Sequence, residues 1–160
     1  KAIIFAADVV AYSKHMEQDQ LGTLNSLAAC ETIIKNLFQQ HNARLFNTGG
    51  DSFFAEFESE ISAVRCAVEF QNALKSHSFA ENNMIRLEFR VGVNSGLVVQ
   101  KSGNLLGDAV NIAARLESLS QPSGISISSK EIQPSNVFGR ILVRLPGNFT
   151  SLRRLHFAKA

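Results

Sequence analysis

The sequence predicts an α+β fold with a βαββαβ core, in which helices pack on an antiparallel sheet and additional strands follow at the C-terminus. Three observations predict it. The chain opens on a continuous apolar run, a stretch with helical spacing follows, and two short aromatic-rich segments then flank a Gly-Gly pair. Its 160 residues are enough for one sizeable hydrophobic core, so residues 1–160 are expected to form a single domain.

The first half of the core follows from three patterns in order. An apolar run that ends in Asp8 is typical of a strand buried on both faces. Apolar residues then recur at helical spacing, and two segments rich in aromatic residues flank Gly49 and Gly50, as in a hairpin. These patterns predict a strand at 2–7, a helix at 20–41 and hairpin strands at 44–48 and 52–57.

The second half continues with a helix, an alternating strand, another helix and a short strand. In the alternating segment, one face is apolar and carries Leu87, Phe89, Val91 and Val93. These patterns predict helices at 61–74 and 107–120, strands at 86–94 and 125–128, and a last hairpin from 140–145 and 152–157. The complete order is that of a ferredoxin-like βαββαβ core with additional C-terminal strands.

Composition excludes several classes of protein. With 45% hydrophobic and 19% charged residues the chain is not of the disordered type, and a net charge of +2 without a basic run argues against nucleic-acid binding. No apolar run approaches the roughly 20 residues of a membrane span, so no membrane contact is expected within this chain. Cys30 and Cys66 lack metal-site spacing and are predicted to be buried, reduced thiols, as in a cytoplasmic protein. Because the chain begins at Lys1, we expect it to be a piece of a longer protein.

Two acidic residues are predicted to meet at one end of the sheet. In a βαββαβ core the first and third strands run side by side and antiparallel, so Asp8, which ends the first, lies beside Asp51, which opens the third. Either residue alone is as well explained by a strand end or a turn. Together they are the oxygen ligands that Mg²⁺ or Mn²⁺ prefers, and with a triphosphate present the pair could bridge two ions.

The helix at 107–120 carries a second candidate pair. Asn111 and Arg115 are spaced i, i+4 and project from one helix face, where an amide and a guanidinium could bind a reacting phosphate. A solvated helix face is the alternative, and Asp108 is interpreted as the helix N-cap. A separate apolar face of the same helix is expected from Ile112, Leu116 and Leu119.

Five stretches, in this order and at this spacing, resemble the catalytic domain of class III adenylate and guanylate cyclases, from Lys1 to about Ser128. They are FAADVVAYS (5–13), FNTGGDSFFAEF (46–57), AVRCAVEFQ (63–71), FRVGVNSG (89–96) and LLGDAVNIAARLESLSQPSGISIS (105–128).

The resemblance implies a role for each matching position. Asp8 and Asp51 occupy the metal-binding aspartate positions, and Val9 the position whose backbone carbonyl helps to hold metal. Asn111 occupies the position that orients the ribose, and Arg115 the position that stabilises the transferred phosphoryl group. In this family the two metals, Mg²⁺ or Mn²⁺, belong to one subunit and the Asn/Arg pair to the other. A homodimer with shared active sites is therefore implied.

The implied reaction converts a nucleoside triphosphate into a 3′,5′-cyclic nucleotide and pyrophosphate for intracellular signalling. The family's base-reading positions hold Asn47 and Asn104, which match neither the adenylate nor the guanylate pattern. ATP is the first expectation, and UTP or CTP stays open because an Asn amide both donates and accepts. Some bacterial members carry Asn at the first position.

Two further departures from the family pattern bear on whether the domain is catalytic. Ala11 stands where the family has Gly, and the tail lacks the family's phosphate-gripping Lys. A catalytically silent nucleotide-binding domain is one alternative, and residues 49–53 (GGDSF) also resemble the GGDEF motif of diguanylate cyclases, with Ser in place of Glu. Candidates for the missing basic residue are Arg144, Arg153, Arg154 and Lys159.

Overall fold

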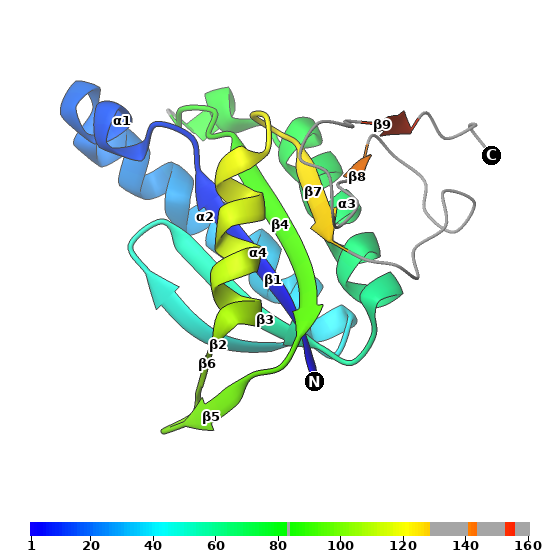
Figure 1. The fold of residues 1–160 in the computed structure, drawn as a ribbon. Helices are drawn as coiled ribbons and strands as arrows, with labels where there is room; N and C mark the ends of the chain where they lie inside the picture. The colour runs from blue at the N-terminus through cyan, green and yellow to red at the C-terminus, as the bar shows by residue number, and fades with distance from the viewer. Residues whose placement is uncertain (83, 129–140, 144–152, 156–160) are drawn as a thin grey trace.

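The computed structural model describes residues 1–82, 84–128, 141–143 and 153–155 (Figure 1). Within these residues seven strands form one sheet in the order β2-β3-β1-β4-β7-β8-β9. Their bounds are β1 Ala2–Val9, β2 Arg44–Gly49, β3 Ser52–Phe57, β4 Phe89–Gly96, β7 Ile125–Ser128, β8 Ile141–Val143 and β9 Arg153–Leu155. The first four strands in this order are the predicted ferredoxin-like core.

The central strand β1 pairs antiparallel with β3 on one side and with β4 on the other, as predicted. Its register places Ala7 opposite Phe53 on β3 and Asp8 opposite Arg90 on β4. The end of β1 therefore lies beside the start of β3, which is the arrangement that brings the two predicted acids together.

The added strands differ from the expected antiparallel sheet. β7 pairs parallel with β4, and β8 pairs parallel with β7, whereas β8 and β9 pair antiparallel as the predicted last hairpin. The physical reason is the helix α4 (Asp108–Leu119) between β4 and β7, since a helical crossover returns the chain in the direction of the first strand.

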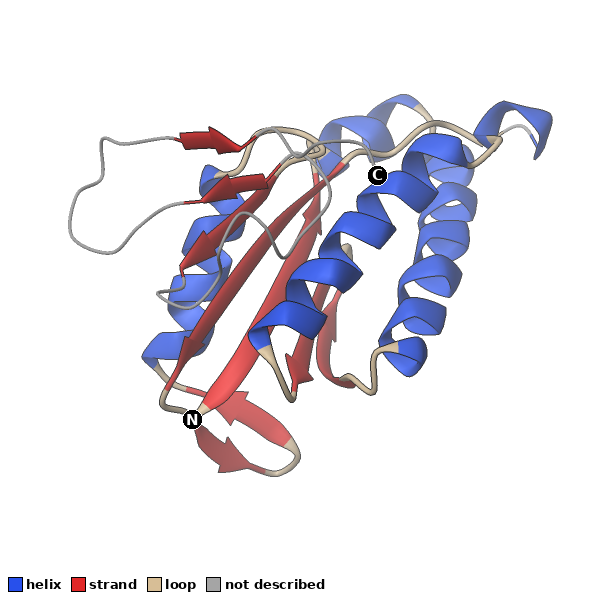
Figure 2. Ribbon diagram, turned by 90° about the vertical axis from the view of Figure 1, so that its right-hand side faces the viewer, coloured by secondary structure: helices blue, strands red, loops and turns tan. Residues whose placement is uncertain are grey.

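Helices cover both faces of the sheet (Figure 2). α2 (Gln20–Gln40) and α3 (Glu60–Ser76) pack on one face over the larger core, and α4 packs on the other. The period of two in β1 divides its side chains accordingly. Phe5, Ala7 and Val9 join the α2/α3 core, and Ala2, Ile4 and Ala6 join the smaller core under α4. Asp8 continues the second set and thus belongs to the α4 face.

The helix ends explain where prediction and structure differ. α2 begins after Asp19, whose carboxylate accepts a 2.9 Å hydrogen bond from the backbone N–H of Gly22. This cap separates α2 from a short helix α1 (Tyr12–Gln18) that the sequence pattern did not predict. The N-cap of α4 is Gly107, and Asp108 is its first helical residue, so the interpretation of Asp108 as N-cap is wrong.

Two small elements complete the described chain. A 3₁₀ turn (Phe79–Asn82) precedes β4, and an unpredicted hairpin of β5 (Val99–Lys101) and β6 (Asn104–Leu106) projects beyond the sheet before α4 (Figure 1). Among the residues that the structure describes, no helix is both long and apolar enough to cross a membrane. Cys30 and Cys66 are free and buried, as predicted, and burial raises the pKa of each thiol to about 12.

Candidate active site

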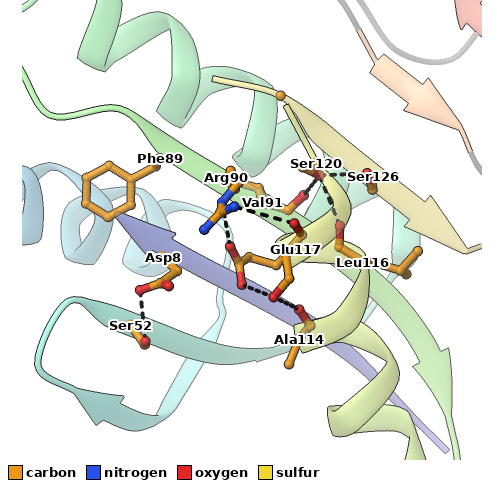
Figure 3. A network of polar contacts seen from close by, with 12 residues as sticks. Asp8, Ser52, Phe89, Arg90, Val91, Ala114, Leu116, Glu117, Ser120 and Ser126 are labelled. Carbon is orange, nitrogen blue, oxygen red and sulfur yellow. Dashed lines mark hydrogen bonds and ion pairs between the residues drawn. The ribbon is translucent and has the colours of Figure 1, made fainter. Parts of the chain in front are cut away.

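The two predicted acids lie together at one end of the sheet. Asp8 is the penultimate residue of β1, Asp51 is in the turn between β2 and β3, and their carboxylates are within hydrogen-bonding reach of each other. Ser52 opens β3 on the same face, and its hydroxyl donates a 3.0 Å hydrogen bond to Oδ1 of Asp8 (Figure 3). Gly50 supplies the turn with a φ of 62°, a conformation that glycine adopts without strain.

The electrostatics of this corner disfavour a second negative charge. Burial and the neighbouring Asp8 carboxylate raise the pKa of Asp51 to about 6. Backbone N–H groups of Asp51 itself and of Val9 donate to the Asp51 carboxylate and oppose the rise. Val9 thus lies beside Asp51, and the predicted role of its carbonyl in metal binding stays a prediction. The corner holds negative charge that the bare protein does not fully compensate.

A divalent cation fits this corner on the chemistry of its donors. Two carboxylates offer hard oxygen ligands, and a cation would relieve the repulsion that raises the pKa of Asp51. Within the described residues no group of three or more His, Cys, Asp or Glu side chains could hold a metal. A cation at Asp8 and Asp51 would therefore take further ligands from backbone oxygen, water or substrate, and the metal-binding role itself stays a prediction.

A third carboxylate, which the sequence analysis missed, belongs to Glu117 on the inner face of α4. Burial, together with the charges of Asp8 and Asp51, raises its pKa to about 7, although Arg90 opposes the rise. Arg90 forms an ion pair with Glu117, with 3.2 Å between Nε and Oε1 (Figure 3). The available signal was spacing, because Glu117 follows the small residues Ala109 and Ala113 at i+8 and i+4 on the face that a sheet can approach closely.

That close approach depends on Gly92 of β4. A Cβ atom at this position would overlap the carbonyl oxygen of Ala113 and the backbone nitrogen of Glu117. Only a glycine lets α4 lie this near the strand, and Asn94 fixes its other end by donating a 2.9 Å hydrogen bond to the carbonyl of Ala109. The inner face of α4 is therefore held against the same sheet face that carries Asp8.

The predicted catalytic pair lies on the opposite face of α4. Asn111 and Arg115 are exposed, and among the described residues their side chains make no hydrogen bond or ion pair. Glu117 is two residues beyond Arg115, which places it about 200° further round the helix axis. Glu117 faces Asp8 and Asp51 of its own chain, so Arg115 faces away from them. One chain does not bring the two predicted half-sites together.

The predicted apolar face of α4 is only partly correct. Leu116 is buried, but Ile112 and Leu119 are 39% and 56% exposed. The buried face instead begins with two alanines, where the helix backbone lies close to Gly92 of β4, and ends with Leu116 and Glu117. The residues that form it are Ala109, Ala113, Leu116 and Glu117.

The two predicted base-reading residues occupy exposed positions on neighbouring strands. Asn47 follows an irregularity in the pairing of β2 with β3, and Asn104 opens β6. Arg44 joins these strands by donating a 2.8 Å hydrogen bond to the carbonyl of Gly103. Of the basic residues suggested for phosphate binding, Arg144 and Lys159 lie outside the described residues, as do the side chains of Arg153 and Arg154 on β9.

Comparison with known proteins identifies the family of the chain. Residues 1–140 match the model of the adenylate and guanylate cyclase catalytic domain. A putative adenylate cyclase 3 of Rhizobium meliloti is 40% identical over 130 residues, which cover 79% of this chain and 22% of that protein. The receptor-type guanylate cyclase gcy-6 of Caenorhabditis elegans is 28% identical over 92% of this chain and 14% of its own length.

Solved structures include an adenylate/guanylate cyclase/hydrolase from Silicibacter pomeroyi, with a TM-score of 0.69 and 35% identity over 78% of this chain and 73% of that one. The chain thus spans between 14% and 22% of the two curated relatives above and most of this solved domain. The match favours this family over the diguanylate cyclases that residues 49–53 resemble. From the ordered motifs, the fold and these similarities together, the chain belongs to the adenylate and guanylate cyclase catalytic domain family.

Proposed function

We propose that this domain converts a nucleoside triphosphate, with ATP as the first candidate, into its 3′,5′-cyclic nucleotide and pyrophosphate. The observation that carries the proposal is the contact between the Asp8 and Asp51 carboxylates at the sheet end, in a chain of the cyclase family. In the proposed reaction the ribose 3′-oxygen bonds to the α-phosphorus, the bond from that phosphorus to the bridging oxygen breaks, and pyrophosphate leaves.

Asp8 and Asp51 would hold two divalent cations, Mg²⁺ or Mn²⁺, with the backbone carbonyl of Val9. When bound, such cations supply positive charge that lowers the pKa of the 3′-hydroxyl and neutralises the triphosphate. The chain's own contribution is to keep both carboxylates at one point. Ser52 holds the Asp8 carboxylate by its hydroxyl, and the N–H groups of Val9 and Asp51 hold that of Asp51.

Asn111 and Arg115 would act on the substrate from the second half-site. Arg115 can donate two parallel hydrogen bonds to phosphoryl oxygens, where negative charge develops in the transition state. The amide of Asn111, one turn earlier on the same face, can orient the ribose. Both side chains are exposed and without partners in the described chain, which suits residues that await a ligand.

The orientation of α4 supports an active site shared between two copies of the chain. Asn111 and Arg115 point away from the acids of their own subunit, so in the proposed site a second copy would supply one half. Large apolar side chains are also exposed on α4 itself and in or just before the β5–β6 hairpin that precedes it, and a protein surface rarely gathers such side chains unless it is covered. These residues are Leu97, Val99, Leu106, Ile112 and Leu119.

A pyrimidine cyclase is the second candidate, favoured by the two exposed amides of Asn47 and Asn104. Each amide offers both a donor and an acceptor, so the pair could bind uracil or cytosine as well as adenine. A catalytically silent domain that binds nucleotide is the third candidate. Product analysis separates these candidates, because a silent domain would bind a triphosphate and release no cyclic nucleotide.

The test is incubation with ATP, GTP, CTP or UTP and Mn²⁺, with mass spectrometry of the products. We expect a cyclic nucleotide from at least one triphosphate, and its loss in Asp51→Ala. Glu58→Ala is the matched control, because Glu58 is an exposed acid that follows the far end of β3. Equal turnover by Asp51→Ala and the wild type would overturn the proposal.

A further inference from the structure

Asp8 and Arg90 occupy directly opposite positions on β1 and β4 and share the α4 face of the sheet. Opposite charges at such positions usually pair, since their Cβ atoms lie only about 5 Å apart. Here they do not pair. Among the ion pairs of the described residues, Arg90 is joined to Glu117 and none joins it to Asp8.

The partner of Arg90 is supplied by α4. Glu117 is 6% exposed and lies where α4 comes closest to the sheet, over Gly92. Its Oε1 is 3.2 Å from Nε of Arg90, and Nη1 of Arg90 donates a 3.4 Å hydrogen bond to the carbonyl of Ser118. Neither Nε nor Oε1 has hydrogen-bond geometry, so opposite charge holds the pair together more than directional bonding does.

The side chains that Asp8 contacts are neutral or negative, although Arg90 lies opposite it. It accepts the hydroxyl proton of Ser52 and contacts Asp51, while Glu117 lies close enough for their charges to interact. In Figure 3 the guanidinium of Arg90 turns toward Glu117, and the Asp8 carboxylate turns toward Ser52. Three carboxylates thus share a corner with one guanidinium, which pairs with the one carboxylate that is not a proposed metal ligand.

We propose that Glu117 is a positioning residue that keeps Arg90 away from Asp8, so that the Asp8 carboxylate stays available to a divalent cation. The inference rests on the proposed metal-binding role of Asp8 and Asp51. A guanidinium bound to Asp8 would compete with the cation for the same oxygens. The ion pair with Glu117 removes this competitor without removing its charge from the protein.

The substitution Glu117→Gln keeps the shape of the side chain and removes its charge. Arg90 then has no anionic partner on α4, and the nearest carboxylate that it can reach from its own strand pair is Asp8. We expect the affinity for Mn²⁺ to fall by roughly tenfold, in the range typical of residues that orient metal ligands. Replacing Arg90 by Gln in the same chain should restore most of that affinity.

The experiment measures Mn²⁺ binding directly, without nucleotide, from the electron paramagnetic resonance signal of free Mn²⁺. The proteins are the wild type, Glu117→Gln, Arg90→Gln and the double variant. In the wild-type background Arg90→Gln should change the Kd less than about threefold, whereas in the Glu117→Gln background it should lower the Kd by about tenfold. This difference distinguishes competition between Arg90 and Mn²⁺ for Asp8 from a mere change in the net charge around the site.

An equal effect of Arg90→Gln in both backgrounds would overturn the proposal, as would unchanged binding in Glu117→Gln. If circular dichroism shows that Glu117→Gln does not fold, the double variant tests the proposal instead, because it has no unpaired guanidinium. Mn²⁺ binding by the double variant that is at least tenfold weaker than wild type would contradict the proposal. Asp8→Asn tests the underlying function separately. Wild-type Mn²⁺ binding by Asp8→Asn would refute the metal site itself, whatever Glu117 does.

Discussion

The hydroxyl of Ser52 donates a 3.0 Å hydrogen bond to Oδ1 of Asp8, a residue 44 positions earlier in the chain. The bond crosses from β3 to β1. Ser52 directly follows Asp51, one proposed metal ligand, and its hydroxyl fixes the orientation of Asp8, the other. Because Ser52 is neutral, it restrains the Asp8 carboxylate without competing for it as a cation would. The hairpin that carries Asp51 therefore also sets the geometry of Asp8.

We predict that Ser52→Ala weakens metal activation more than it weakens turnover. Without the hydroxyl, the Asp8 carboxylate loses a hydrogen bond of a kind that contributes about 1.5 kcal/mol or more when one partner is charged. The KM for Mn²⁺ should rise roughly tenfold, with kcat at saturating Mn²⁺ within about threefold of wild type. Ser52→Thr retains the donor and should restore the KM. A fall in kcat alone would contradict an orienting role.

The raised pKa of Asp51 predicts a pH-dependent gain in stability from Asp51→Asn. The pKa is 3.8 for an ordinary Asp and about 6 here, so the folded chain binds more protons than the unfolded chain between these values. The contribution of Asp51 to the free energy of unfolding is fully present below pH 3.8 and is lost as the pH rises through about 6. Asp51→Asn should therefore raise Tm by a few degrees at about pH 8, measured without metal, and hardly at all near pH 4.

Added Mn²⁺ provides the control for this prediction. The wild type should gain Tm from Mn²⁺ at about pH 8, because the cation binds the two carboxylates of the folded state. Asp51→Asn should gain much less. If the Tm difference between the two proteins is the same at both pH values, ionisation of the Asp51 carboxyl does not destabilise the folded chain.

We predict that Gly92→Ala destabilises the chain strongly. Among the described glycines whose φ is not positive, we expect Gly92 to be the one at which a change to Ala costs most. The new Cβ would collide with backbone atoms of Ala113 and Glu117, and backbone cannot rotate away as a side chain can. The free energy of unfolding in urea should fall by about 3 kcal/mol. Gly49→Ala is the control, since nothing lies within 4 Å of its Cβ position. Equal stability of the two variants would exclude the close contact.

The predicted fold and the proximity of Asp8 and Asp51 both came from sequence patterns that each span a whole strand, helix or hairpin. Tertiary contacts do not change which element such a pattern forms. The buried run of β1 and the Gly-Gly hairpin specify which strands neighbour each other, and strand adjacency then brings the acids together. The short helix α1 was missed because its residues are mostly exposed and carry little apolar periodicity. It begins after Ala11, whose φ of 54° explains why the family has Gly at this position.

Glu117 was missed for a different reason. A glutamate in a helix is usually solvated, and the sequence does not reveal that Gly92 allows α4 to approach β4 until Glu117 is enclosed. The expected apolar face failed at Ile112 and Leu119 for the same reason, because the face held against β4 is the one that carries Ala109, Ala113 and Glu117. Patterns within one helix cannot report how closely another element approaches it.

We predict that Asn47→Lys combined with Asn104→Asp shifts base preference toward ATP. The two positions lie on adjoining strands, β2 and β6, and Lys and Asp are the residue types that the resemblance to adenylate cyclases implies there. A mismatched polar contact to a base costs on the order of 1–3 kcal/mol, so the kcat/KM for ATP relative to UTP should rise at least tenfold. Unchanged ratios among the four triphosphates would exclude a base-reading role.

The last prediction concerns the division of the active site between two subunits. Asp51→Ala and Arg115→Ala should each be nearly inactive, the second because a donor to developing phosphoryl charge contributes about 3 kcal/mol. Arg65→Ala is the control, since Arg65 is an exposed residue of α3, on the other face of the sheet. If Arg115 were only a solvated residue of α4, Arg115→Ala would keep wild-type activity.

Mixing the two inactive variants then decides whether one chain or two build the site. In a mixed dimer, the intact Asp8 and Asp51 of one subunit face the intact Asn111 and Arg115 of the other, and the second site carries both lesions. Activity should return to about a quarter of wild type, since about half of randomly paired dimers are mixed and each has one working site. Activity should also fall faster than linearly on dilution. A mixture without activity, although native mass spectrometry detects mixed dimers, would mean that each chain builds its own site, against the outward orientation of Arg115 on α4.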